Sequence, residues 1–73
     1  MKTYLITLQL SQQESTYTNL SAYLKTAVSW AHPMNNTWII STSKSVSDVR
    51  DGIKSRIHSG DKALVILVSV NFI

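Results

Sequence analysis

Two hydrophobic periods alternate along this 73-residue chain, and the order in which they occur restricts the folds that it can adopt. Residues 3–10 alternate with a period of two, the spacing of a strand with one strongly apolar face. In residues 17–28 the apolar positions recur at helical spacing instead. Residues 63–68 are apolar at every position, which is typical of a strand buried on both faces, and we expect this strand to continue to Ile73.

A hairpin is indicated in the middle of the chain. Two β-prone segments, residues 29–34 and 37–42, flank the pair Asn35-Asn36. Asn tolerates the positive φ that tight hairpin turns require. Pro33 cannot donate a hydrogen bond to a neighbouring strand, so the first of these two strands is predicted to be a short or bulged edge strand.

A second helix is predicted between the hairpin and the last strand. Its apolar stripe is Val46, Val49, Ile53 and Ile57. Ser45 followed three residues later by Asp48 approximates a capping box at its start. Gly60 is placed to end it. Gly52 in its interior costs about 1 kcal/mol relative to Ala, unless it allows close packing onto the sheet.

The resulting order of elements, β-α-β-β-α-β, predicts one α+β domain over residues 1–73. Right-handed connections place both helices on one face of a four-stranded antiparallel sheet, which is a ferredoxin-like sandwich. The first and last strands are the most apolar, and we expect them to be neighbours or near neighbours at the centre of the sheet.

Length and the absence of cysteine point to self-association. A single core in a chain of this size supplies about 3–5 kcal/mol, and there is no disulfide to add to it. Two helices cover one face of the sheet only, so the other face would expose an apolar patch, and such patches are typical of interfaces. We expect a homodimer in which the sheet faces pack together or the last strands pair across subunits. The residues expected on this face are Leu5, Thr7, Gln9, Val65, Leu67 and one of Trp38 or Ile39. The alternative is that scattered apolar residues are tolerated on an open sheet.

The formal charge of +3 allows weak attraction to DNA or RNA. The best candidate cluster for phosphates lies on and beside the second helix: Lys44, Arg50, Lys54 and Arg56. An ordinary solvated helix face is the alternative. Trp30 and Trp38 flank the hairpin turn, where they would either stack on bases or pack on each other across the strands.

The chain offers no clear pattern for catalysis, a metal or another cofactor. Metal-assisted hydrolysis needs carboxylates or histidines that converge on the ion. The four acidic residues fall in separate local settings: Glu14, Asp48, Asp51 and Asp61. His32 and His58 would suit a base or a ligand pair, but an edge strand and a helix end are ordinary places for histidine. No serine stands in a nucleophile motif.

Short motifs are spread over nearly the whole chain: residues 1–7, Trp30 with His32, Ser41 after residues 37–40, Val49-Arg50-Asp51 and Asp61-Lys62. Together they resemble the SinR-like proteins, which are small bacterial proteins similar to the ferredoxin-like subunit of CRISPR spacer acquisition and to virulence-associated protein D. The resemblance implies a dimer of ferredoxin-like subunits, in some members with metal-dependent nuclease activity. It also implies a Tyr-Asp pair at the end of the first strand, where the Asp is the candidate metal ligand. Leu8 and Gln9 occupy these positions here, and a neutral amide is a poor ligand for Mg²⁺.

Three functions remain open at this point. The first is a non-catalytic, dimeric binding protein of a defence or mobile-element system, with nucleic acid or a protein as partner. The second is a metal-dependent endonuclease or ribonuclease toxin, and the third is a phage- or host-encoded protein-interaction module. The start of the chain lacks the apolar core of a signal peptide, and its longest apolar run is too short to span a bilayer. We therefore expect a cytoplasmic protein without membrane contact.

Overall fold

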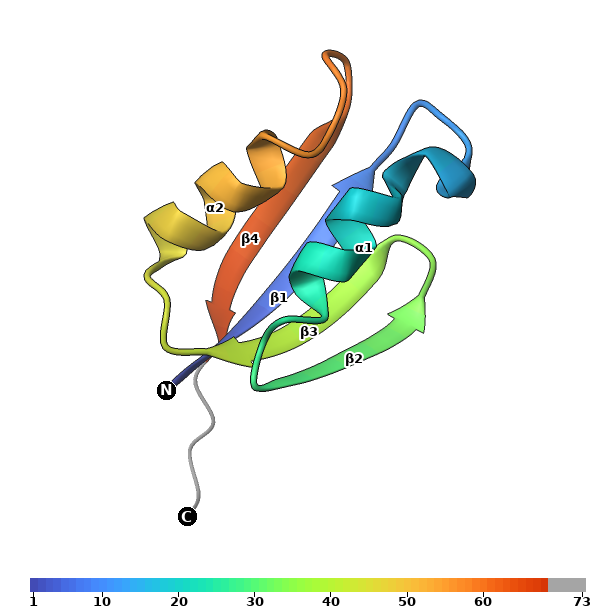
Figure 1. Ribbon diagram of the computed structural model, residues 1–73. Helices are drawn as coiled ribbons and strands as arrows, with labels where there is room; N and C mark the ends of the chain where they lie inside the picture. Colours follow the sequence, from blue (N-terminus) through green and yellow to red (C-terminus); the bar gives the residue numbers. More distant parts are fainter. Residues whose placement is uncertain (69–73) are drawn as a thin grey trace.

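The predicted order of strands and helices is confirmed by the computed structural model, which describes residues 1–68 apart from the side chain of Glu14. The strands are β1 (Lys2–Gln9), β2 (Ser29–Met34), β3 (Thr37–Thr42) and β4 (Lys62–Val68). The helices are α1 (Thr18–Leu24), which follows a 3-10 turn (Glu14–Tyr17), and α2 (Val46–Lys54). Figure 1 shows the resulting α+β fold, which is ferredoxin-like. The part of the predicted last strand from residue 69 to 73 lies outside the described residues.

The four strands form one antiparallel sheet in the order β2-β3-β1-β4. β1 is central, since Leu5 lies opposite Ile39 of β3 on one side and Ile66 of β4 on the other. The first and last strands are therefore neighbours, as predicted, but β4 is an edge strand and its predicted central position is wrong. The helix α2 packs on β4 and covers it from one side.

β2 is the other edge of the sheet, as Pro33 predicted. The register between β2 and β3 shifts between Ala31 and Met34, and Pro33 lies within this irregular stretch. The predicted bulge is therefore confirmed, and it places the residue without an N–H where regular pairing is interrupted.

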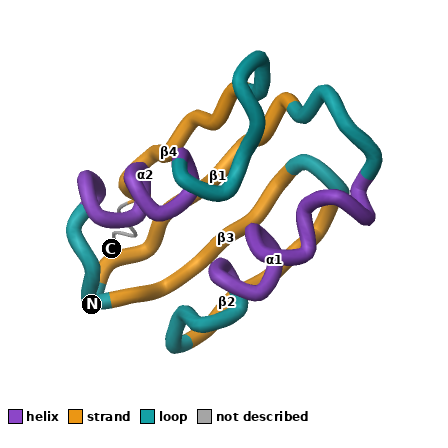
Figure 2. Tube along the Cα trace, turned by 45° about the horizontal axis from the view of Figure 1, so that its top comes forward, coloured by secondary structure: helices purple, strands orange, loops and turns teal. Residues whose placement is uncertain are grey.

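Both helices lie on the same face of the sheet (Figure 2), and the core fills the space between the two layers. The strand residues in it are Tyr4, Ile6, Leu8, Trp38 and Ile40. The helices and the 3-10 turn contribute Tyr17, Leu20, Leu24, Val49 and Ile53. The apolar stripe of each helix packs on the apolar face of the sheet, which explains why apolar residues recur at helical spacing in the sequence.

The helix ends differ in part from the sequence prediction. The side chain of Ser45 accepts a hydrogen bond from the N–H of Asp48 at 3.2 Å, so the predicted N-cap of α2 is confirmed. α1 ends at Leu24, so the predicted helical segment to residue 28 is too long. Gly60 does not end α2, which stops at Lys54. With φ of +124°, Gly60 instead makes the turn into β4. No helix within residues 1–68 has the length and apolarity needed to cross a membrane.

Candidate binding surfaces on the two sides of the sheet

The face of the sheet that points away from the helices is apolar along its middle. Residues opposed in antiparallel strands share a face, so the pairing defines rows that cross the sheet from β2 to β4. The middle row is Ala31, Ile39, Leu5 and Ile66. The rows beside it are Ser29, Ser41, Thr3 and Val68, and Met34, Thr37, Thr7 and Leu64. We call these three rows the open face.

The open face combines exposed hydrophobic side chains with an almost complete lack of charge. Met34, Ile39, Leu64, Ile66 and Val68 are all exposed there. Its hydroxyl groups are partly paired, since Thr3 Oγ1 and Ser41 Oγ lie 3.0 Å apart. Among the paired strand residues of this side, the one charged side chain is Lys62, which lies opposite Gln9 at one end.

The predicted face of two β4 residues is wrong. Val65 lies opposite Ile6 and Leu67 lies opposite Tyr4, so both are on the helix side, where Val65 packs against the core. Leu64 and Ile66 occupy the open face in their place. The remaining predicted residues, Leu5, Thr7, Gln9 and Ile39, do lie on that side, and their role in a dimer stays a prediction.

The end of β1 does not fit a metal ion. Gln9 and Lys62 lie opposite each other there and line a hollow of about 190 Å³. The other residues that line it are Thr7, Leu8, Ala63 and Leu64, so the hollow offers an ammonium group and no carboxylate. Within residues 1–68, no group of three or more acidic or histidine side chains is arranged to hold a metal. A hard cation such as Mg²⁺ therefore has no ligand set at the position that the family pattern implies.

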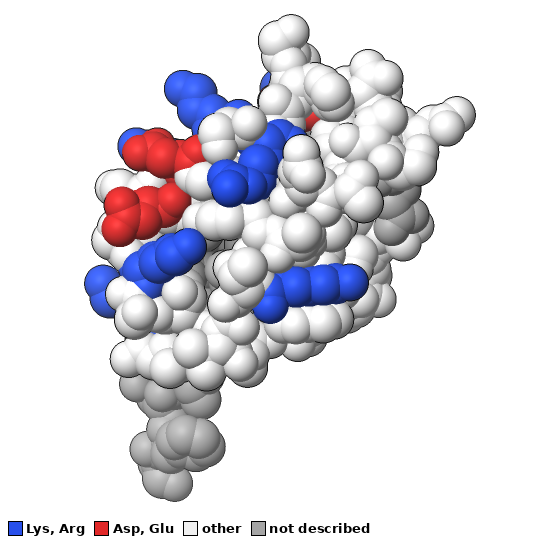
Figure 3. Space-filling view, in the orientation of Figure 1, with Lys and Arg blue, Asp and Glu red and all other residues white. Residues whose placement is uncertain are grey.

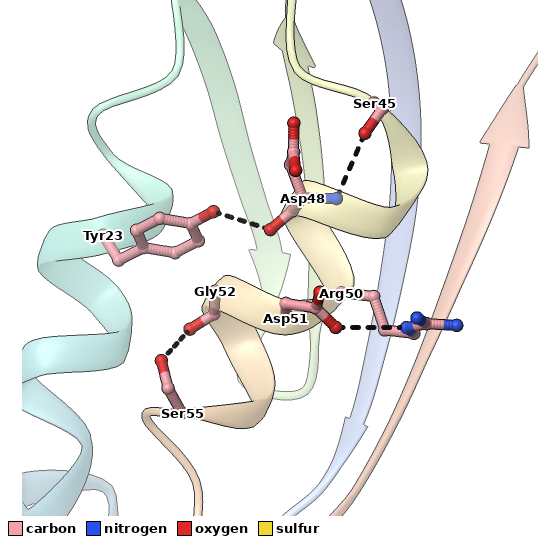
Figure 4. Close-up of polar contacts among 7 residues, drawn as sticks. All are labelled: Tyr23, Ser45, Asp48, Arg50, Asp51, Gly52 and Ser55. Atoms are coloured by element: carbon pink, nitrogen blue, oxygen red, sulfur yellow. Dashed lines mark hydrogen bonds and ion pairs between the residues drawn. The ribbon is translucent and has the colours of Figure 1, made fainter.

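The helix side is charged, and its most developed feature is a groove between α1 and α2. In Figure 3, which looks onto this side, basic side chains are spread over the surface and acidic ones gather over α2. Tyr23 of α1 points toward α2 (Figure 4) and lines two neighbouring hollows of about 540 and 260 Å³. Asn19, Thr26, Ser55 and Arg56 also line the first hollow, and Thr26, Thr42 and Lys44 also line the second. We call the two hollows together the Tyr23 groove.

Two cations meet at the ring of Tyr23. Lys44 Nζ lies 4.6 Å and Arg56 Cζ lies 4.2 Å from the ring centroid, both within the range of a cation–π contact. Lys44 precedes the N-cap of α2 and Arg56 follows its C-cap, so the helix carries one of them at each end. Arg56 is also held by its Nη1, which donates to the carbonyl oxygen of Gly52 at 2.8 Å.

The four predicted basic residues therefore do not form one cluster. Lys44 and Arg56 converge on Tyr23, whereas Arg50 points away from it (Figure 4) and pairs with Asp51 at 3.5 Å. Lys54 is exposed in the last turn of α2. The sequence pattern identified basic residues on and around one helix, but it did not show that an aromatic ring of the other helix brings two of them together.

Gly52 provides the space that Tyr23 occupies. A Cβ atom at this position would overlap the hydroxyl and the ring of Tyr23. The Tyr23 hydroxyl lies 3.5 Å from the carbonyl oxygen of Asp48, one turn earlier in α2. The expected benefit of close packing at Gly52 is therefore present, but the partner is a side chain of α1 rather than the sheet.

The two tryptophans pack on each other across β2 and β3, as one of the two predicted alternatives had it. Their ring centroids are 5.6 Å apart. His32 stacks on Trp38 with ring centroids 3.9 Å apart, and Lys25 Nζ lies 5.1 Å from the Trp30 ring. Trp38 is 2% exposed and has no free face for a base. His32 is a packing residue in this arrangement.

Asp61 is the centre of a polar cluster that the sequence did not reveal. Its carboxylate accepts hydrogen bonds from the N–H and hydroxyl of Ser11, both at 2.7 Å, the hydroxyl of Tyr17 at 2.7 Å and the N–H of His58 at 2.8 Å. The ring of His58 also contacts that of Tyr17, edge to face, at 5.3 Å. The cluster ties the loop after β1 to the loop before β4. Ser11 and Asp61 are 50 positions apart, so no local pattern pairs them.

The hydrogen bonds to Asp61 control its ionisation. Desolvation raises the pKa of its carboxyl group, but the hydrogen bonds from Ser11, His58 and Tyr17 stabilise the charged form and lower the pKa by more. The pKa therefore lies well below its ordinary value of 3.8, so Asp61 is charged at neutral pH, where it has a structural role. It does not fit a general acid or base.

Comparisons of the chain with family models, with curated proteins and with solved structures found no significant match, so the family resemblance stays an expectation from the sequence.

Proposed function

We propose that this protein is a homodimeric binding protein in which the open faces of two copies pack together and the helix sides point outward toward a nucleic acid. The observation that carries this proposal is the open face, with its apolar middle row and no charged side chain in its three rows. A surface of this kind is costly to leave in water and presents no charge that a partner would have to neutralise.

A second copy of the chain suits this face because an uncharged surface is compatible with itself. A two-fold axis brings each residue of the patch against the same set of residues, so charges near the centre would meet like charges. The middle row has none. Four strands about 4.8 Å apart and six residues about 3.3 Å apart give a footprint of about 400 Å² per copy. The two copies together would bury about 800 Å², which is below the standard size of specific interfaces, so we expect a weak dimer that forms at high protein concentration.

Support for a nucleic acid on the helix side comes from the distribution of cations and aromatics. Five basic residues are exposed on or beside the elements of that side: Lys25, Lys44, Arg50, Lys54 and Arg56. The three rows of the open face contain no aromatic side chain, so they lack the platform on which sheet-binding proteins stack bases. Dimerisation would double the positive charge of +3 per chain on one particle.

Two substitutions in β4 test which face joins the copies. Leu64 lies on the open face and Leu67 on the helix side, and both side chains are 56% exposed. Leu64→Lys and Leu67→Lys therefore place the same charge at equal exposure on opposite faces of one strand. We expect Leu64→Lys to convert the dimer to a monomer and Leu67→Lys to leave it intact, as measured by light scattering on a sizing column.

Two outcomes would overturn the proposed dimer. A wild-type chain that is monomeric at millimolar concentration would remove it, and a dimer that Leu67→Lys breaks while Leu64→Lys does not would place it on the other face. The nucleic-acid part is tested by oligonucleotide binding over a range of salt concentrations. Affinity that is absent at low salt, or that does not fall as salt rises, would contradict it.

A further inference from the structure

The cations at Tyr23 differ from the other exposed cations in that they already lie in place. Lys44 and Arg56 both rest on one ring, which restricts long side chains that are otherwise costly to immobilise. Arg56 is further fixed because its Nη1 donates to Gly52 O and, at 3.0 Å, to Ser55 Oγ. A ligand that binds them does not have to order them first.

Both cations keep donors that are available to a ligand. The hydrogen bonds of Arg56 within the described part of the chain all involve Nη1, which leaves Nε and Nη2 unused. Lys44 Nζ has no hydrogen bond or ion pair with any described residue, and it lies over the Tyr23 ring. No carboxylate lines either hollow of the Tyr23 groove. The groove is therefore positive and not neutralised from within.

Among the neutral polar groups of the groove, the amide of Asn19 is the one of the type that contacts phosphate. Thr26 lies at the junction of the two hollows, and the side chains of Asn19 and Ser55 line the larger one. The hydroxyls of Thr26 and Ser55 already donate to Tyr23 O at 2.6 Å and to Gly52 O at 3.0 Å, so they keep no proton for a phosphate oxygen. An amide beside Lys and Arg is a usual partner of phosphate oxygens. Two cations already lie over the Tyr23 ring, so the groove suits the recognition of negative charge better than the stacking of a base.

We infer that the Tyr23 groove is the phosphate-binding subsite of this protein, with Lys44 and Arg56 as the residues that contact the backbone phosphates of a bound nucleic acid strand. This inference rests on the proposed function and locates its ligand site. Lys44 and Arg56 then differ in role from the two basic residues of α2, because Arg50 and Lys54 lie outside the groove.

A pair of double variants separates these roles. Lys44→Gln with Arg56→Gln removes one lysine and one arginine from the groove, and Arg50→Gln with Lys54→Gln removes one of each outside it. The change in net charge is the same for both. The probe is a fluorescein-labelled single-stranded oligonucleotide, and binding is followed by anisotropy over a range of salt concentrations.

We expect the groove variant to lose about tenfold or more in affinity, and its slope of log affinity against log salt to fall by about 1.4, the value for two lost single-strand contacts. The outer variant should lose less than about threefold, which is what a general reduction of charge would cause. Equal losses in both variants would overturn the subsite while leaving nucleic-acid binding in place. No binding by the wild-type chain would overturn both, so the two failures are distinguishable.

The subsite can also be tested on the wild-type chain, without any substitution that would affect folding. Titration with the same oligonucleotide, followed by amide resonances in nuclear magnetic resonance, should shift the signals of Asn19, Thr26 and Ser55 first. Shifts confined to the open face, for example at Thr3 and Leu5, would contradict the subsite. Circular dichroism and the molecular mass of both double variants confirm that they fold and dimerise as the parent does.

Discussion

On its helix side the sheet presents Tyr4, Ile6 and Ile40 to two helices, whereas on its open side it presents Leu5, Ile39 and Ile66 to solvent. These residues at the middle of the two faces are similarly apolar, but their surroundings differ. The helix side is covered by the two helices of the same chain, and the outer surface of this layer carries most of the charged residues. The open side has almost no charge and no cover among the described residues, which teaches that hydrophobicity alone does not separate a core from an interface in so small a domain.

The largest expected difference between the faces is in the cost of a cavity. Ile6→Ala should lower the free energy of unfolding by about 3 kcal/mol, because this side chain is fully buried under the helices. Its neighbour Leu5 lies on the open face and is half-buried. Leu5→Ala should lower the free energy of unfolding by about 1 kcal/mol in dilute solution. Urea unfolding measures both values.

The same pair of variants also tests the dimer. At a protein concentration about a hundredfold higher, the wild-type chain should gain stability from association. Leu5→Ala should gain less stability from association, so the difference in unfolding free energy between this variant and the wild type should grow with concentration. For Ile6→Ala this difference should not grow in the same way. Deficits that are equal for the two variants in dilute solution would contradict the assignment of the faces.

The next largest effect is expected at Asp61, a charged residue whose role is to stabilise the fold. Asp61→Asn should lower the melting temperature at pH 6, because an amide cannot replace an anion that accepts four hydrogen bonds. The folded-state pKa of Asp61 is lowered, so its contribution is complete above the ordinary value of 3.8 and is lost as the pH falls through the folded-state value.

Thermal unfolding of both proteins between pH 6 and strongly acidic pH checks this sign. The difference in melting temperature between the wild type and Asp61→Asn should be largest at neutral pH and should shrink in acid. A difference that grows as the pH falls would show that the carboxyl group is not stabilised in its charged form.

A smaller effect is expected at the contact between the helices, where Gly52 and Tyr23 should depend on each other. Gly52→Ala improves the helix propensity of α2 by about 1 kcal/mol, but it forces Tyr23 from its position. In the background of Tyr23→Ala the overlap is absent, so the same substitution should then stabilise the protein by about that amount. In the wild-type background it should give no such gain.

A double-mutant cycle by denaturant unfolding measures this coupling. Gly52→Ala in the wild-type background should also weaken oligonucleotide binding, since Lys44 and Arg56 rest on the displaced ring. A full stabilising effect of Gly52→Ala with Tyr23 present would contradict the close packing of α1 on α2.

The smallest effect is expected for an ion pair on the outer surface. Arg50 and Asp51 lie 3.5 Å apart, and both side chains are 68% exposed. Arg50→Ala should change the free energy of unfolding by less than about 0.5 kcal/mol, because water screens such pairs. A loss of more than about 1 kcal/mol in denaturant unfolding, the size of a typical hydrogen bond, would mean that Arg50 has a partner that the structure does not show.

Much of the fold follows from local patterns in the sequence. The alternation of residues 3–10 indicated a strand, and the helical spacing of Val49 and Ile53 indicated a helix. Pro33 correctly indicated an edge, because a residue without an N–H cannot sit between two strands. Ser45 correctly indicated the start of α2.

The faces of β4 could not be predicted in the same way. Residues 63–68 are apolar at every position, so no alternation distinguishes one side from the other. The pairing of Ile6 with Val65 decides the question, and it depends on a register between strands that are far apart in the chain. The Asp61 cluster and the two cations at Tyr23 escaped prediction for the same reason, since tertiary contacts bring their members together.

Contacts between two copies of the chain can be detected directly, and they decide whether the open faces form the dimer. In a mixed sample, one copy carries ¹³C-labelled methyl groups and the other does not, so nuclear Overhauser effects filtered for different labels arise between copies only. We expect such effects at the methyl groups of Leu5, Ile39 and Ile66. A dimer whose effects come from Val46, Leu67 and other exposed helix-side residues, or a sample without any because the chain is monomeric, would contradict the proposed dimer.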